Sequence, residues 1–210
     1  MTTTMPRSLR ADAEDNRDRV LEAARDLFAR DGLAAPMRAI AGRAGVATAT
    51  LYRRFPTKQA LVLEVFGHQL QACRGIVRQA VADPDPWRAL CGVVERVLVL
   101  NAANQGFTDA FFSAYPGSFD LVAHRTEMLR DIAAIARRAV LAGRLRPDFA
   151  VADFTLVVLA GRGLSSTPDA ERIAAARRFA ALAIDGLRAA DSNGPLPARA
   201  RVVGSAVGLP

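Results

Sequence analysis

One stretch constrains the fold more than any other. The run from Arg38 to Lys58, RAIAGRAGVATATLYRRFPTK, has the pattern of two short helices joined by a tight turn. Ile40 and Ala44 lie one helical turn apart, and Gly45 supplies the backbone freedom that a turn requires. Leu51 then returns an apolar contact to the first helix. This arrangement predicts a helix-turn-helix.

The same stretch concentrates positive charge. Between Pro36 and Lys58 there are five basic residues and no Asp or Glu, so the local charge is +5. A surface of this kind suits a phosphate backbone. The net charge of the whole chain, +7 at pH 7, is weaker evidence, because the distribution of charge marks a nucleic-acid-binding face better than its total.

The run from Ile40 to Leu61, IAGRAGVATATLYRRFPTKQAL, resembles the N-terminal signature of the TetR family of bacterial transcriptional regulators. The matching features are the AGV turn, the TLY triplet, Phe55 and Lys58. At motif level the resemblance covers Val20 to Leu63, and the rest of the chain agrees in helical pattern and length. The resemblance implies a ligand-responsive repressor that binds duplex DNA and has no enzymatic activity.

In such folds the second helix of the motif enters the major groove, and its first turn faces base edges. Small side chains there imply readout through hydroxyls and through methyl contacts to thymine. The resemblance assigns Tyr52 and Lys58 to backbone phosphates, and neighbouring arginines fit the same role. Core packing is the alternative for Tyr52, and an ordinary solvated surface is the alternative for the arginines. The expected DNA-binding residues are Arg38, Thr48, Ala49, Thr50, Tyr52, Arg53, Arg54 and Lys58.

Capping residues indicate where the neighbouring helices begin and end. Residues 1–14 are polar and predict a mobile arm, which is either an unstructured end or a segment that reaches a DNA groove. A first helix is expected to start between Asp12 and Asn16 and to end at Arg30, before Gly32. The DNA-binding domain then spans residues 15–57.

Two helix starts in this domain lack a good capping side chain. Pro36 fits the first position of a helix, but Ala35 before it cannot cap. Ala47 has the same defect, although Thr48 can substitute there. Thr57, in contrast, is a suitable N-cap for a long helix that starts at Lys58.

Residues 58–190 predict a ligand-binding and dimerisation domain, and residues 191–210 mix Pro, Gly and Ser without periodicity, which predicts a disordered tail. No strand-like alternation is found. The expected architecture is all-α, with about nine helices: three in an N-terminal head and six in a C-terminal bundle. The expected bundle helices cover residues 58–81, 87–103, a short aromatic segment near 107–115, 119–142, 149–164 and 169–190.

The densest aromatic cluster of the chain, in the FTDAFFSAY segment, is either plain core or the wall of a pocket for an apolar or aromatic effector. A few polar residues on neighbouring segments can orient such a ligand. The candidate pocket residues are His68, Glu95, Asn101, Asn104, Phe107, Phe111, Phe112, Tyr115, Phe119 and His124.

The last two helices have Ala-rich apolar faces that either form a four-helix homodimer interface or pack within the bundle. One DNA-binding head contacts few bases, so a two-fold dimer and a near-palindromic operator are expected. The candidate interface residues are Ala152, Thr155, Leu156, Leu159, Phe179, Leu182, Ala183 and Leu187.

Other classes of protein find less support. Cys73 and Cys91 are too few for a disulfide framework, and no run is apolar enough for a membrane span, so a cytoplasmic protein is expected. His68 and His124 form no convincing metal pair with the cysteines, and no cofactor motif is present. A helical adaptor that binds only protein is the first rival to a regulator. An enzyme is the second, although no catalytic motif frames its Ser, His and Asp residues.

Overall fold

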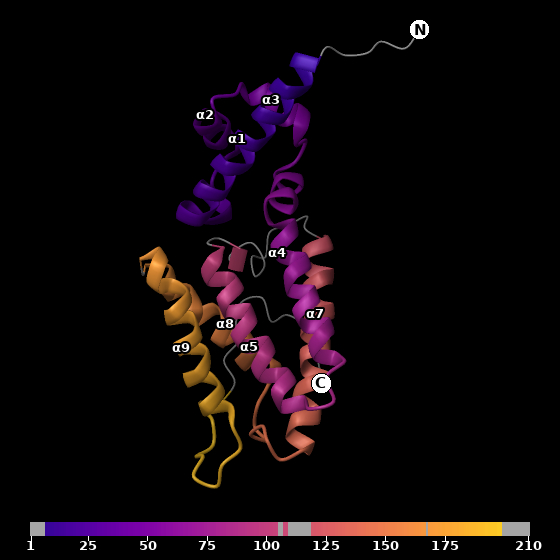
Figure 1. Ribbon diagram of the computed structural model, residues 1–210, viewed down its shortest axis with the longest axis vertical. Helices are drawn as coiled ribbons and strands as arrows, with labels where there is room; N and C mark the ends of the chain where they lie inside the picture. The colour runs from indigo at the N-terminus through magenta and orange to yellow at the C-terminus, as the bar shows by residue number, and fades with distance from the viewer. Residues whose placement is uncertain (1–6, 105–106, 109–118, 167, 199–210) are drawn as a thin grey trace. The chain divides into compact units, whose positions relative to one another are not determined.

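The computed structural model describes residues 7–104, 107–108, 119–166 and 168–198 (Figure 1). Its regular elements in these ranges are helices, as expected, and one isolated antiparallel bridge joins Leu145 to Arg188. The chain forms two compact units that divide between His68 and Gln69. The boundary predicted after Thr57 lies earlier than this division, because the start of the long helix belongs to the first unit.

The first unit contains α1 (Arg7–Asp31), the 3-10 turn η1 (Gly32–Ala34), α2 (Met37–Ala44), α3 (Thr48–Arg54) and the beginning of α4 (Lys58–Val81). Its core is made by large side chains that are almost fully buried, among them Phe28, Ile40 and Leu61. The rings of Phe28 and Phe66 lie 6.0 Å apart between centroids. This core joins α1 and α4 to the two short helices.

Helix α1 begins earlier than predicted, at Arg7, so the residues expected to form the end of a mobile arm are helical. Residues 1–6 lie outside the described residues. Helix α2 begins one residue later than predicted, because Pro36 has an extended backbone and occupies the N-cap. Ala47 is the N-cap of α3 and no side chain caps that end, so Thr48 does not substitute. Thr57 does cap α4: its Oγ1 accepts a hydrogen bond from the Ala60 amide at 3.1 Å.

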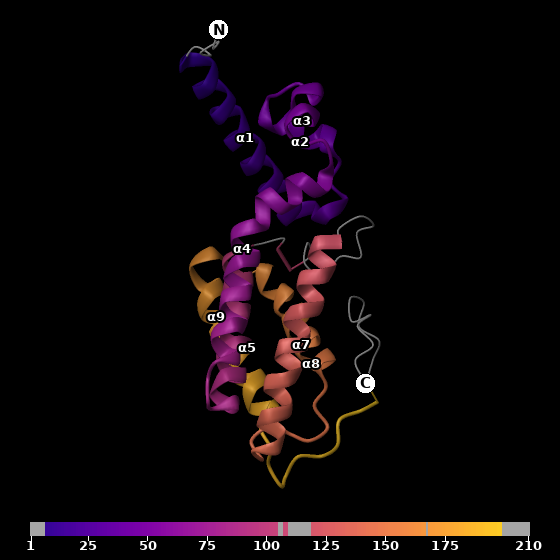
Figure 2. The same cartoon turned by 90° about the vertical axis from the view of Figure 1, so that its right-hand side faces the viewer.

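The second unit contains the rest of α4, α5 (Pro86–Ala103), α7 (Phe119–Leu141), α8 (Val151–Ala160), the 3-10 turn η2 (Gly161–Ser166) and α9 (Asp169–Leu187). Helix α5 lies against α7, α8 and α9, as Figures 1 and 2 show, and most of its apolar side chains are buried. Asp85 caps its start by accepting from the Trp87 and Arg88 amides. Of the predicted aromatic segment, only Phe107 and Thr108 lie within the described residues.

Gly161 permits a close contact between η2 and α5. A Cβ at this position would lie 2.7 Å from the Leu98 Cδ2 atom, which is closer than real Cβ contacts come. Helix α8 ends one residue earlier, at Ala160, and continues as η2, whereas a single helix was predicted over 149–164. The expectation that small residues here allow close helix contact holds for Gly161.

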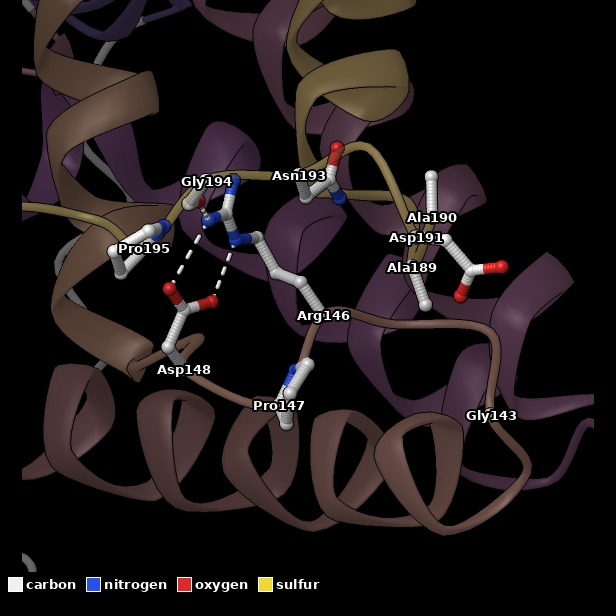
Figure 3. A pocket seen from close by; sticks show the side chains of 10 residues that line it. All are labelled: Gly143, Arg146, Pro147, Asp148, Ala189, Ala190, Asp191, Asn193, Gly194 and Pro195. Carbon is white, nitrogen blue, oxygen red and sulfur yellow. Dashed lines mark hydrogen bonds and ion pairs between the residues drawn. The ribbon is translucent and has the colours of Figure 1, made fainter.

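The segment after α9 is attached to the turn before α8 (Figure 3). Arg146 is buried; its guanidinium bonds both carboxylate oxygens of Asp148 and donates to the Gly194 carbonyl at 2.8 Å. The Leu196 amide donates to Asp148 at 2.9 Å. Part of the tail that was predicted to be disordered therefore has a defined anchor, and residues 199–210 lie outside the described residues.

No helix in the described parts of the chain is long and apolar enough to cross a membrane.

Candidate functional site

The turn between α2 and α3 depends on the backbone of Gly45. Its φ and ψ are 66° and 32°, in the left-handed region that favours glycine. The Val46 amide reaches back to the Ala41 carbonyl at 3.0 Å, which closes the end of α2. A Cβ at Gly45 would lie 3.6 Å from the Arg19 Nη1 atom, an ordinary contact. The demand for glycine therefore comes from the backbone conformation and not from lack of space.

Helix α3 has one buried face and one exposed face. Leu51 is 1% exposed and the following Phe55 is 5% exposed, so these two side chains hold α3 against the core. Tyr52 is 47% exposed, which excludes the alternative that it is a core residue. Thr48 and Ala49 are exposed on the first turn. The exposed face therefore presents the residue types that the sequence assigned to DNA.

The positive charges of this surface differ in their surroundings. Arg43 pairs with Asp26 at 2.5 Å, which neutralises one of the five charges locally. Arg38, Arg53 and Arg54 are exposed, and no ion pair within the described ranges involves them. These three guanidinium groups are accessible to an anion.

Lys58 has a second role that the sequence did not indicate. Its ammonium donates a hydrogen bond to the Leu33 carbonyl in η1, and partial burial lowers the pKa of the lysine. Lys58 thus connects the turn after α1 to the start of α4. A substitution at this position tests this contact together with the phosphate contact that the resemblance implies.

The candidate pocket residues are not all brought together. Asn101 and Asn104 lie at the end of α5, and Phe107 is 2% exposed. Glu95 is exposed on the outer face of α5, so it does not point into the bundle. His68 is exposed and belongs to the first unit. Four aromatic side chains lie outside the part that the structure describes: Phe111, Phe112, Tyr115 and Phe119.

His124 lies on α7 beside Arg74 of α4. The Arg74 Nη1 atom is 2.9 Å from the His124 Nε2 atom, so the arginine donates to the ring nitrogen. Arg74 also pairs with Glu127 at 3.4 Å. This cluster connects α4 to α7 and accounts for His124 without a ligand.

Gln69 is a polar residue near the end of α5 that was not predicted from the sequence. Its Nε2 atom donates to Asn104 Oδ1 at 2.7 Å. Helical spacing contained the signal, because Val65 and Cys73, four residues before and after Gln69, are each 2% exposed. Gln69 therefore lies on the buried face of α4, whereas its neighbour His68 does not.

The candidate interface residues on α8 and α9 divide into two groups. Leu156 and Leu182 are 52% and 63% exposed, and Ile173, which was not predicted, is 39% exposed. Thr155 is 0% exposed and Leu187 is 8% exposed, so these two side chains pack within the protomer and do not belong to an exposed face. The remaining predicted residues are partly exposed: Ala152, Leu159, Phe179 and Ala183.

An open pocket of about 610 Å³ lies between the turn after α7 and the segment after α9 (Figure 3). Its charged pair, Arg146 and Asp148, is satisfied by internal hydrogen bonds. Elsewhere in the described ranges, no three His, Cys, Asp or Glu side chains are placed to hold a metal ion.

Together, an all-α fold, a glycine-closed helix-turn-helix and a basic second helix define the class of helix-turn-helix DNA-binding proteins. Residues 20–65 match the family model described as bacterial regulatory proteins, tetR family. The DNA-binding region of this chain is therefore of the TetR family type, and the proteins that it resembles are named as transcriptional regulators.

Individual relatives agree with this assignment. The chain is 34% identical over 103 residues to the HTH-type transcriptional repressor KstR of Mycobacterium tuberculosis. The matched residues make up 48% of this chain and 47% of KstR. The chain therefore matches about half the length of this repressor. The fold is similar to PfmR from Thermus thermophilus, with a TM-score of 0.61, 22% identity and coverage of 79% of this chain and 97% of PfmR. It is also similar to Bacillus subtilis FadR in complex with stearoyl-CoA, with a TM-score of 0.52, 17% identity and coverage of 81% and 99%.

Proposed function

We propose that this protein is a DNA-binding transcriptional repressor that places α3 in the major groove. The observation that carries the proposal is the division of α3 into a face anchored by Leu51 and an exposed face that is basic and free of acidic residues. Arg53 and Arg54 extend from this helix without an ion pair among the described residues, which leaves their donors available for phosphates.

The proposed contacts divide into base readout and positioning. Thr48, Ala49 and Thr50 form the first turn of α3, which is the part of a recognition helix that meets base edges. Hydroxyl and methyl groups of this size favour contacts to thymine methyls and to single hydrogen-bonding edges. Tyr52, which is exposed, and the cations of the surface position the helix on the DNA backbone in this proposal.

The functional unit that we propose is a two-fold dimer formed through α8 and α9. Leu156 of α8 and Leu182 of α9 leave large apolar side chains exposed on the protomer. Burial of these side chains releases roughly 25 cal/mol per Å² of apolar surface, which favours a self-complementary contact between copies. Two heads related by a two-fold axis require a near-palindromic operator.

Binding of DNA is tested by footprinting on the region upstream of the protein's own and neighbouring genes. The expected result is one protected, near-palindromic site. A chain that protects no site at any concentration up to micromolar, while remaining folded by circular dichroism, is not the proposed repressor. It would instead fit the helical adaptor considered from the sequence.

We further propose that a small, largely apolar or aromatic effector binds in the second unit and releases the operator. The aromatic cluster of the sequence and the buried Phe107 support such a site. The FadR neighbour, which was solved with stearoyl-CoA, supports it by analogy of fold alone. A tenfold loss of DNA affinity needs a preference of about 1.4 kcal/mol of the ligand for the non-binding state. Gel-shift titration of a compound library against the footprinted site tests for release.

A further inference from the structure

The end of α5 contains a chain of amide hydrogen bonds whose direction is fixed by a backbone carbonyl. The Leu100 carbonyl accepts from Asn104 Nδ2 at 2.8 Å. Asn104 Oδ1 accepts from Gln69 Nε2 at 2.7 Å. Since a carbonyl can only accept, the orientation of the Asn104 amide is determined, and through it the orientation of the Gln69 amide. The Gln69 Oε1 atom is therefore an acceptor and cannot exchange places with the amide nitrogen.

Two buried side-chain oxygens, one on Gln69 and one on Asn101, have no donor among the described residues. Gln69 Oε1 and Asn101 Oδ1 are buried, and neither receives a hydrogen bond from a residue that the structure describes. Asn101 precedes Asn104 by three residues, so both side chains lie on the same side of the last turn of α5. Buried polar atoms are nearly always paired in native proteins, and a pair of unmet acceptors calls for a partner that donates.

The backbone at the C-terminal end of α5 also presents hydrogen-bond acceptors. The last carbonyls of a helix carry partial negative charge, and side chains satisfy two of them here. Asn104 bonds the Leu100 carbonyl, and Arg172 Nε bonds the Ala102 carbonyl at 2.6 Å. Gln69 Oε1 and Asn101 Oδ1 extend this acceptor surface. A ketone, an ether or a carboxylate would place a further acceptor against it and would be disfavoured.

We propose that the effector carries a hydrogen-bond donor, a hydroxyl or an amide N–H, that donates to Gln69 Oε1 beside the end of α5, where Asn101 Oδ1 is a second buried acceptor. This inference rests on the proposed regulatory function and names the chemistry of its effector. It adds a polar requirement to a site otherwise expected to prefer apolar or aromatic molecules. Gln69 also lies on α4, which begins at Lys58 directly after the DNA-binding motif, so a ligand held there contacts the helix that follows α3.

The test compares probes that differ only in their ability to donate. Phenol and anisole, and naphthol and methoxynaphthalene, each share one ring system and exchange a hydroxyl for a methoxy group. Binding to the full chain is measured by isothermal calorimetry and by thermal shift, without DNA. We expect each alcohol to bind at least about tenfold more tightly than its ether, because the hydroxyl hydrogen is donated to a buried acceptor that is otherwise unmet.

Three variants test whether Gln69 causes the preference for the alcohol over the ether. Gln69→Met removes the acceptor at similar size and should abolish the preference for the alcohol. Asn104→Leu leaves Gln69 in place but removes its orienting partner, and should reduce the preference. Gln71→Met, at an exposed position on the same helix, is the matched control and should retain it. Unchanged far-ultraviolet circular dichroism confirms that each variant is folded.

Equal binding of alcohol and ether to the parent overturns the proposal, and so does an alcohol preference that survives in Gln69→Met. Equal binding is also what a permanently bound water on the two acceptors would produce. Failure of every probe to bind up to its solubility limit counts against the site as well. Failure of the proposed function has a different signature, because the alcohols then bind with the expected preference but change no DNA affinity.

Discussion

Gly42 and Gly45 lie three residues apart at the end of α2, and we predict that alanine has opposite effects at the two positions. Gly45 has a φ of 66°, which costs an L-residue about 1–2 kcal/mol, so Gly45→Ala should destabilise the first unit by about that amount. Gly42 has ordinary helical backbone, and a Cβ there would meet no atom within 4 Å. Gly42→Ala should therefore stabilise by about 0.5–1 kcal/mol.

Native-state hydrogen exchange measures the two effects where they arise. The Val46 and Leu51 amides donate to the Ala41 and Ala47 carbonyls, so their protection reports directly on the turn and on the start of α3. Protection of both amides should fall in Gly45→Ala and rise in Gly42→Ala. Thermal unfolding provides a second measure, because 1 kcal/mol corresponds to about 4–8 °C in a domain of 60–100 residues.

The matched pair makes the outcome decisive. A loss of stability in both variants would mean that space around the turn, and not the backbone angle, determines these positions. A gain in both would mean that Gly45 does not occupy the left-handed region in solution. Either result would refute the geometry on which the placement of α3 depends.

Three further predictions concern the second unit. Arg146 holds the pKa of Asp148 well below its usual range. The ionised carboxylate therefore stabilises the fold above its unfolded pKa of about 3.9, and this stabilisation is lost as the pH falls below that value. The difference in unfolding free energy between the parent and Asp148→Asn, measured by urea unfolding, should shrink below about pH 4. Burial raises the pKa of Cys73 to about 12, so iodoacetamide at pH 8 should label the partly exposed Cys91 well before Cys73, as mass spectrometry of peptides will show. Leu182→Glu should convert the proposed dimer to a monomer in light scattering, whereas Leu141→Glu, at a position that is 81% exposed on α7, should leave the mass unchanged.

Local signals in the sequence were sufficient for much of the first unit. Glycine at the turn, Thr57 at the start of α4 and the apolar positions of α3 each act over a few residues, so their structural roles could be predicted. The start of α2 was predicted one residue too early, because Pro36 is compatible with both the N-cap and the first helical position. Thr48 could not cap α3, since it is itself the first helical residue.

The candidate ligand site was harder to predict because it depends on which face of each helix is buried. Glu95 of α5 is exposed to solvent. Asn101 and Asn104, at the C-terminal end of the same helix, have a buried side-chain oxygen and a hydrogen bond to Gln69, respectively. His68 was predicted from its residue type, but helical phase places it on the exposed face of α4 and places Gln69 toward the buried face. Periodicity alone would have ranked these two positions correctly.

The buried and exposed faces of α8 and α9 were equally hard to predict from the sequence. Thr155 and Leu156 are adjacent on α8, yet one is buried and the other is 52% exposed. A mostly apolar sequence gives little contrast between the two faces of a helix, so its phase cannot be read from composition. The anchor of the C-terminal segment on Arg146 was likewise hidden, because it joins residues 48 positions apart.

The central claim is that the exposed basic face of α3 binds DNA, and the salt dependence of binding tests it most directly. Fluorescence anisotropy with a duplex from the footprinted region gives the slope of log K against log salt for three proteins: the parent, the double variant Arg53→Ala and Arg54→Ala, and the control Arg96→Ala. Each phosphate contact contributes about 0.9 to this slope, so loss of two contacts in each head of a dimer should flatten it by about 3.6. Arg96 is exposed on α5 in the second unit and should have no effect. Three coincident slopes would contradict the assignment of DNA binding to this face.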